Sequence, residues 1–423
     1  MSRRVGIWGA FAAVHVLLAW ICLGLPGTGI GELGVGLPLG DVTLVYRPWA
    51  EQALSGGPIV GITTGWVYPG AALLPMLAAM GLGPDAYGQT WLALVTIANG
   101  AAFAVLLGRR PSRRREAAAW WWLAFTALLG PIALARIDSI TVPLAVAAVL
   151  LVWRHPRVGG VLLAVATWMK VWPAALIGAL LVSSRSRRTI LLSGLVTSAV
   201  IAASVVVLGG GRYLFGFVTE QTGRGLQIES PISTAYLWMV SAQVPGTAIY
   251  YDRSILTFQV AGPGIGVAID LMTPILAFAV VGTVLAGLLA VHRGASTLRL
   301  FPSLALALVL VLIVFNKVGS PQFQTWLIAP VIAGILWRGR AFAWPAGLAL
   351  GVAALTQVVY PYLYGWLLSA SGVLITVLTL RNAGLVVLLG WALADVWRAG
   401  TSAVQSASSA ASSRSTLAVS SPE

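Results

Sequence analysis

The stretch "VGIWGAFAAVHVLLAWICLGL", residues 5–25, contains no Asp, Glu, Lys or Arg. An apolar run of about 20 residues crosses a ~30 Å hydrocarbon core as an α-helix. Arg3 and Arg4 precede the run, and no small-residue cleavage site is evident, so we expect a retained signal-anchor helix. Similar runs recur along 423 residues that are 58% hydrophobic and 9% charged, whereas soluble domains carry about 25% charged residues. The sequence therefore predicts an all-α polytopic membrane protein.

The net charge of +14 comes from short basic clusters between the apolar segments, such as "RRPSRRR" (109–115) and "RSRR" (185–188). This pattern is typical of cytoplasmic loops, and no cluster is long enough, or interleaved with aromatic residues, to bind nucleic acid. If every cluster is cytoplasmic, the chain crosses the cell membrane about 12 times and both termini are cytoplasmic. The single cysteine, Cys22, excludes disulfides and cysteine metal sites.

The organisation that follows is one integral-membrane domain, residues 1–398, with long first and fourth outer loops at 26–85 and 209–262. The first loop contains a short apolar run that we expect to be a re-entrant or interfacial helix. Residues 158–184 either span twice or form a re-entrant hairpin. Residues 399–423, rich in Ser and Ala, are expected to be a disordered cytoplasmic tail.

The first outer loop contains "GDVTLVYRPWAEQALSGG", residues 40–57, which is unusually polar for this chain. The other predicted outer turns also carry ionisable residues, among them Arg136, Asp138, Lys170, Lys317 and Arg381. Charges near hydrocarbon are costly and normally face a cavity or a partner. We therefore predict one charged, water-accessible cavity on the extracytoplasmic side.

The chemistry available in this cavity is that of carboxylates and cations. His155 and His292 fall at cytoplasmic ends and His15 lies within the first apolar run, so a histidine nucleophile or a metal site is not expected. The sequence contains neither a phosphate-binding P-loop nor a dinucleotide fingerprint, and no cofactor is predicted. A carboxylate base with cations that bind phosphate suits glycosyl transfer from a phosphate-bearing lipid.

These segments resemble the GT-C membrane glycosyltransferases, specifically glycosyltransferase family 87, the polyprenyl-phosphate-mannose-dependent α-mannosyltransferases of actinobacteria. The resemblance covers roughly residues 1–398, and "MKVWP" (169–173) and "KVGSPQF" (317–323) are its more specific parts. Further matching segments are "VYPGAALLP" (67–75), "NKVGSPQFQTWLIAP" (316–330) and "LRNAGLVVLL" (380–389). The resemblance implies a GT-C-like fold and a catalytic base at Asp41.

Donor-phosphate contacts are predicted at Lys170, Lys317 and Arg381, and further substrate contacts at Arg47, Glu51, Gln322, Gln324 and Asp138. Structural alternatives accompany several of these residues. Asp41 can cap a short helix, Arg47 can pair with Glu51, and Lys170 can be an internal partner of Asp138. We expect Arg136 and Asp138 to form a structural pair.

The sequence thus predicts an inverting transferase that moves a hexose, mannose above all, from a polyprenyl-phosphate donor to a glycolipid or lipoglycan acceptor at the outer leaflet. Its other partners are membrane lipids. The alternative is a transporter or lipid flippase with a charged central cavity. Transporters commonly show repeated halves, and we find no internal repeat in this sequence.

Overall fold

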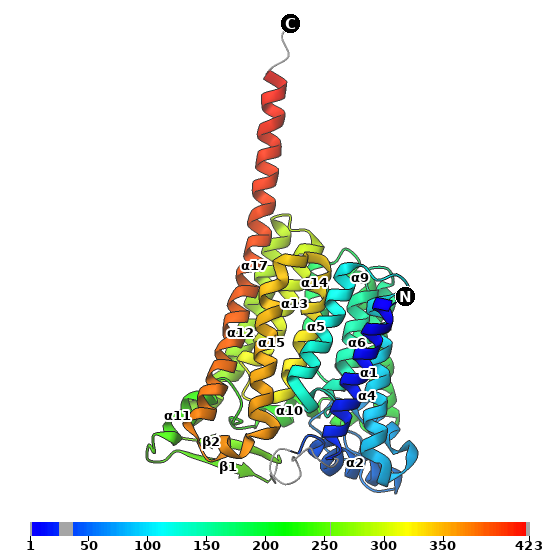
Figure 1. The fold of residues 1–423 in the computed structure, drawn as a ribbon, viewed down its shortest axis with the longest axis vertical. Coiled ribbons are helices and arrows are strands. Elements are labelled where there is room, and N and C mark those ends of the chain that lie inside the picture. Colours follow the sequence, from blue (N-terminus) through cyan, green and yellow to red (C-terminus); the bar gives the residue numbers. More distant parts are fainter. Residues whose placement is uncertain (1, 25–36, 254, 420–423) are drawn as a thin grey trace.

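The computed structural model describes residues 2–24, 37–253 and 255–419. Within these residues, twelve α-helices of ten residues or more form an elongated bundle (Figure 1). They are α1 (Ser2–Cys22), α4 (Tyr87–Leu107), α5 (Arg113–Leu129), α6 (Asp138–Leu151), α7 (Pro156–Met169), α8 (Ala174–Ser183), α9 (Arg187–Val207), α12 (Ile265–His292), α13 (Thr297–Val314), α14 (Ile328–Arg338), α15 (Ala343–Gln357) and α17 (Gly372–Val419).

The helices differ in how much of their apolar surface they bury. Helix α13 lies in the centre of the bundle, and nearly all of its side chains are buried. Helices α9 and α12 instead leave large apolar side chains exposed, among them Leu192, Val196, Val200, Phe278 and Val281. Because water disfavours so much exposed apolar surface, these faces indicate contact with lipid. The chain is therefore a polytopic, almost entirely helical membrane protein.

Seven of the described segments are long and apolar enough to cross a membrane. Helices α6, α7 and α8 contain 14, 14 and 10 residues, which is shorter than the ~20 residues that a full crossing requires. Helices α7 and α8 are the two halves predicted around Lys170. The count of twelve crossings stays a prediction.

One end of the bundle carries most of the non-bundle structure, including α2 and the β1–β2 hairpin (Figure 1). The first predicted outer loop forms η1 (Val42–Tyr46), α2 (Arg47–Leu54) and the short helical pieces η2 (Gly70–Ala72), α3 (Leu73–Ala78), η3 (Ala79–Leu82) and η4 (Pro84–Ala86), and residues 26–36 of this loop lie outside the described residues. The large loop before α12 forms η6 (Gly211–Tyr213), α10 (Gly216–Thr222), α11 (Ser233–Ser241), β1 (Ala248–Asp252) and β2 (Thr257–Ala261).

The predicted all-α fold class is confirmed, because the described chain is nearly all helical, and the large loop adds a short two-stranded β-hairpin to it. Strands β1 and β2 are antiparallel, with Ala248 opposite Ala261 and Asp252 opposite Thr257. Gln227 forms an isolated antiparallel bridge with Gln259, so residues 226–228 lie along β2. The runs "AIYYD" and "TFQVA" contain the β-branched and aromatic residues that suit strands.

The disordered tail predicted for residues 399–423 stays a prediction, and residues 420–423 lie outside the described residues. Helix α17 continues as far as Val419 and extends beyond the bundle (Figure 1). Alanine, which recurs in residues 399–419, is the strongest helix former. The bundle end from which α17 emerges is also the end at which α1 begins, opposite α2 and the hairpin.

Candidate active site

Asp41 precedes η1 at the same end of the bundle as α2. Its side chain makes no capping hydrogen bond, so the capping alternative does not hold. Its Oδ2 instead lies 2.9 Å from Nε of Arg136, and the Asp41 side chain is 40% exposed while that of Arg136 is 7% exposed. Asp41 is thus a carboxylate that solvent can reach, and its partner in the ion pair is a buried guanidinium.

Arg136 is fixed by groups from several parts of the chain. Its Nη1 donates to the carbonyl oxygens of Pro38 and Ala135, and its Nη2 donates to the Tyr360 hydroxyl at 3.2 Å. Burial is the largest single effect on the pKa of Arg136 and lowers it, but Asp41, Tyr360 and Tyr46 together outweigh burial and raise the pKa. A fully engaged guanidinium of this kind orients the Asp41 carboxylate.

The predicted pairing of Arg136 with Asp138 is wrong. Asp138 is the first residue of α6 and is fully buried, and its Oδ2 accepts a hydrogen bond from Lys170 Nζ at 3.1 Å. Its Oδ1 accepts one from Trp326 Nε1 at 2.6 Å. Arg136 lies in the bend before α6 and Asp138 is the first residue of that helix, and the two side chains reach different partners. The alternative that made Lys170 an internal partner of Asp138 is confirmed.

Lys170 connects this buried pair with the neighbourhood of Asp41. Its ammonium lies 5.1 Å from the centre of the Tyr68 ring and 5.5 Å from that of Phe323. Burial lowers the pKa of Lys170, but Asp138 chiefly, with smaller contributions from Tyr68 and Asp41, raises it overall. Lys170 therefore stays a cation within the electrostatic reach of Asp41, and its side chain keeps 15% exposure.

Aromatic side chains line the first outer loop beside these charges. Tyr46 stacks on Trp49, and its hydroxyl lies 3.4 Å from that of Tyr68. Trp66 meets both Trp49 and Tyr68 edge to face, with ring centres 5.5 Å apart in each case. The Trp66 indole is almost fully buried, and its Nε1 has no hydrogen-bond partner among the described residues. Packed rings of this kind give the site a rigid wall.

Arg47 and Glu51 do not join the Asp41 cluster through any contact within the described residues. Arg47 Nε lies 2.7 Å from Glu51 Oε1 along α2, and both side chains are more than one-third exposed. This is the (i, i+4) ion pair that the sequence offered as an alternative to substrate binding.

Arg381 and Lys317 lie in other surroundings. Arg381 is buried in α17, where its Nη2 donates to the backbone oxygen of Glu229 at 2.9 Å and lies 3.4 Å from Glu229 Oε2. Burial raises the pKa of Glu229 to about 7, and Arg381 and Arg136 oppose that shift. Lys317 is buried beside Gln227, whose backbone N–H donates to the Lys317 oxygen at 3.0 Å. Burial lowers the pKa of Lys317, and Asp270 opposes the shift.

Gln322 and Gln324 are buried in η7 (Pro321–Leu327), the segment that also supplies Phe323 and Trp326. The Oε1 of Gln324 has no hydrogen-bond partner within the described ranges. Burial without a partner costs about 1–3 kcal/mol for a neutral polar group, so this amide oxygen is a feature that packing alone does not account for.

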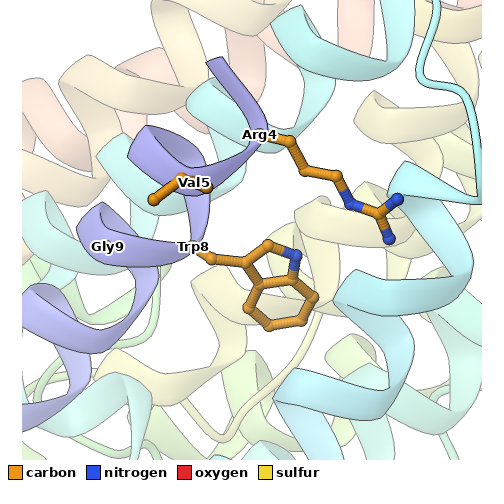
Figure 2. Close-up of a pocket in the computed structure, with 4 residues that line it drawn as sticks. All are labelled: Arg4, Val5, Trp8 and Gly9. Carbon is orange, nitrogen blue, oxygen red and sulfur yellow. The ribbon is translucent and has the colours of Figure 1, made fainter. Parts of the chain in front are cut away.

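A separate pocket lies at the other end of the bundle, at the N-terminal end of α1. It is lined by Arg4, Val5, Trp8 and Gly9, and Figure 2 shows the Arg4 and Trp8 side chains extending to the same side of the helix. The Arg4 guanidinium donates to the Arg109 oxygen at 3.0 Å. These four lining residues include one cation, Arg4, but no carboxylate, so the pocket lacks the acid that distinguishes the Asp41 cluster.

The fold and the site together define a membrane protein in which one partly exposed acid faces cations from later turns. The sequence model of glycosyltransferase family 87 matches residues 66–243, which include Arg136, Asp138, Lys170 and Glu229. The resemblance to this family is thereby confirmed, and the match indicates a glycosyltransferase. No curated protein and no solved structure matches the chain.

Proposed function

We propose that the chain is an inverting glycosyltransferase that moves mannose from a polyprenyl-phosphate donor to a glycolipid or lipoglycan hydroxyl at the outer leaflet. In this proposal the end of the bundle that carries Asp41 is extracytoplasmic and both termini are cytoplasmic. The positive charge of the loops at the other end supports this orientation.

Accessibility is the observation that carries the proposal. Three ion pairs at this end of the bundle join separate segments of the described chain, Asp41–Arg136, Asp138–Lys170 and Glu229–Arg381, whereas the Arg47–Glu51 pair lies within α2. The acid is 40% exposed in the first pair but 1% and 3% exposed in the other two. A general base must come within hydrogen-bond reach of the proton that it takes, so Asp41 is the one of these three acids that an acceptor can approach.

The reaction that follows is a single displacement. An oxygen of the Asp41 carboxylate takes the proton of the acceptor hydroxyl while the hydroxyl oxygen attacks the anomeric carbon of the donor sugar. The bond between this carbon and the phosphate oxygen breaks, and polyprenyl phosphate leaves with the electron pair. Attack from the opposite face converts a β-linked donor into an α-linked product.

The negative charge of the leaving phosphate needs cations rather than a general acid. Lys170 is placed for this role, because an ammonium has three N–H donors and Asp138 accepts from one of them. Arg136 supports the reaction by positioning Asp41. Phosphate contacts from Lys317 and Arg381 stay predictions, as do the substrate contacts of Arg47, Glu51, Gln322, Gln324 and Asp138.

The test is Asp41→Asn in purified protein reconstituted into nanodiscs, supplied with labelled polyprenyl-phosphate mannose and a lipid extract as acceptor. Loss of a positioned general base lowers the rate by about 10²–10⁴-fold. Asp85→Asn is the matched control, because Asp85 is an exposed acid of η4 at the same end. Near-normal turnover by Asp41→Asn would remove Asp41 as the base. A parallel reaction with polyprenyl-phosphate arabinose decides the sugar.

A further inference from the structure

A polar pocket of about 360 Å³ lies in the large loop that precedes α12, and the reaction described above leaves it unused. Six of the residues that line it can form hydrogen bonds through their side chains: Thr219, Glu220, Arg224, Tyr250, Asp252 and Gln259. Small-molecule pockets span about 300–1,000 Å³, so the volume is sufficient for a ligand. The lining is drawn from α10, the following loop and both strands of the hairpin.

The polar groups of this pocket are held in fixed positions. Gln259 is almost fully buried, its Nε2 donates to Asp252 Oδ2 at 2.9 Å, and its Oε1 accepts from the Tyr250 hydroxyl at 3.3 Å. A β-carbon at Gly225 would lie 1.9 Å from Gln259 Oε1, so only glycine lets the amide take this place. The buried Nε of Arg224 has no hydrogen-bond partner among the residues that the structure describes.

The charges of the pocket select the class of ligand. Two carboxylates, Glu220 and Asp252, act electrostatically on one guanidinium, Arg224, so the lining carries a net negative charge and disfavours phosphate. Carboxylates accept hydrogen bonds from hydroxyl groups and a guanidinium donates to them, while the Tyr250 hydroxyl, whose proton goes to Gln259 Oε1, can accept from them. The Tyr250 side chain, 44% exposed, adds an aromatic face. Such a mixture suits a sugar unit, which has several hydroxyl groups and apolar C–H faces.

The pocket adjoins the first outer loop and therefore the candidate active site. A β-carbon at Gly65 would lie 3.0 Å from Glu220 Oε1, which places this carboxylate against the backbone beside Trp66. Tyr68 acts electrostatically on Arg224, and the same Tyr68 ring lies 5.1 Å from the Lys170 ammonium. A ligand in the pocket would thus lie beside the first outer loop, which also carries Asp41.

We propose that this pocket binds an uncharged sugar unit of the acceptor, next to the unit whose hydroxyl is glycosylated. The inference rests on the proposed function where it identifies the bound sugar as part of the acceptor. Sugar binding at the pocket itself does not depend on transfer. The pocket would then determine which glycans the enzyme extends, while Asp41 performs the proton transfer.

The test is equilibrium binding of radiolabelled octyl α-mannoside, octyl β-glucoside and octyl β-galactoside to the full chain in nanodiscs, without donor. We expect at least one glycoside to bind, and Asp252→Asn and Arg224→Lys to weaken that binding about 10-fold, as the loss of one charged hydrogen bond does. Asp252→Asn keeps an oxygen for Gln259 Nε2, which preserves the local fold. Arg212→Gln, in the same loop but outside the pocket, should bind as the unmodified protein does.

Binding of none of the three glycosides, or equal binding by the pocket variants and the unmodified protein, would overturn the inference. Because the binding measurement uses no donor, it tests the inference separately from the proposed function. If the protein binds a sugar but transfers none, only the proposed function is rejected. Where transfer is observed, the pocket variants should raise KM for the glycoside about 10-fold with kcat and the donor KM unchanged. A fall in kcat with an unchanged KM would also contradict an acceptor pocket.

Discussion

Replacing Asp138 with alanine would leave the ammonium of Lys170 without its counter-ion. The Asp138 side chain is 1% exposed and that of Lys170 is 15% exposed, so water can replace little of the lost interaction. The same change would remove the acceptor of the short hydrogen bond from Trp326 Nε1. Both groups would remain enclosed between α6, η7 and the α7–α8 turn.

The magnitude follows from this burial. Removing one partner of a buried ion pair costs about 3–5 kcal/mol, because the remaining charge stays buried and uncompensated. The partial exposure of Lys170 places the expected loss near the lower end of this range, and the orphaned indole N–H adds about 1–3 kcal/mol. Asp138→Asn should cost less, since the amide oxygen can still accept from Lys170 or Trp326.

Equilibrium unfolding in mixed micelles with increasing SDS, followed by circular dichroism, measures the free energy of unfolding for each variant. Lys170→Met and the double variant with Asp138→Ala complete a double-mutant cycle, and we expect a coupling energy of about 1–3 kcal/mol. Glu51→Ala is the control, because the Arg47–Glu51 pair is exposed on α2 and its loss should leave the unfolding midpoint unchanged.

An Asp138→Ala midpoint equal to that of Glu51→Ala would refute the reasoning. It would mean that Lys170 is hydrated and that its contact with Asp138 carries no stability. A large loss in Asp138→Ala with no coupling in the cycle would refute the pairing itself, because the cost would then come from another contact of the carboxylate.

Three further predictions concern the other buried charges. Arg136→Gln removes the guanidinium that positions Asp41. A displacement of the base by about 1 Å lowers the rate about 10²-fold, and we expect a loss of this size in the transfer assay. Burial raises the pKa of Glu229 from 4.5 to about 7, so its contribution to stability is fully present below about pH 4.5 and is lost as the pH rises through 7. Relative to Glu229→Gln, the unmodified protein should therefore lose up to roughly 3 kcal/mol of unfolding free energy between these pH values. Asp395→Ala removes a buried partner of Arg338 at the end of the bundle away from Asp41, so unfolding free energy should fall by about 3 kcal/mol with the transfer rate of the folded enzyme unchanged.

The fold class could be predicted from the sequence because membrane burial imposes a simple rule on composition. A helix in lipid needs a long apolar run, and α12, with 28 residues, shows it plainly. The hairpin gave no comparable signal: β1 and β2 have five residues each and lie in a polar loop. Their pairing depends on contact with residues 226–228, which sequence periodicity does not report.

The partners of the charged residues were harder to predict than the residues themselves. Arg136 was recognised as an outer-turn cation, but its closeness in sequence to Asp138 suggested a local pair. Arg136 lies in the bend that precedes α6, and its side chain reaches Asp41 in the first outer loop instead.

Which of the three acids is accessible can be determined only from the folded structure. Asp41, Asp138 and Glu229 all lie in predicted outer turns, and each has a cation as its partner. Asp138 is covered by Trp326, 188 residues away in the sequence, and the backbone oxygen of Glu229 accepts from Arg381, 152 residues away. These distant segments enclose two of the three carboxylates and leave the third open to an incoming hydroxyl. The assignment of the base therefore depends on which carboxylate the later turns fail to cover, since all three are paired and charge alone does not distinguish them.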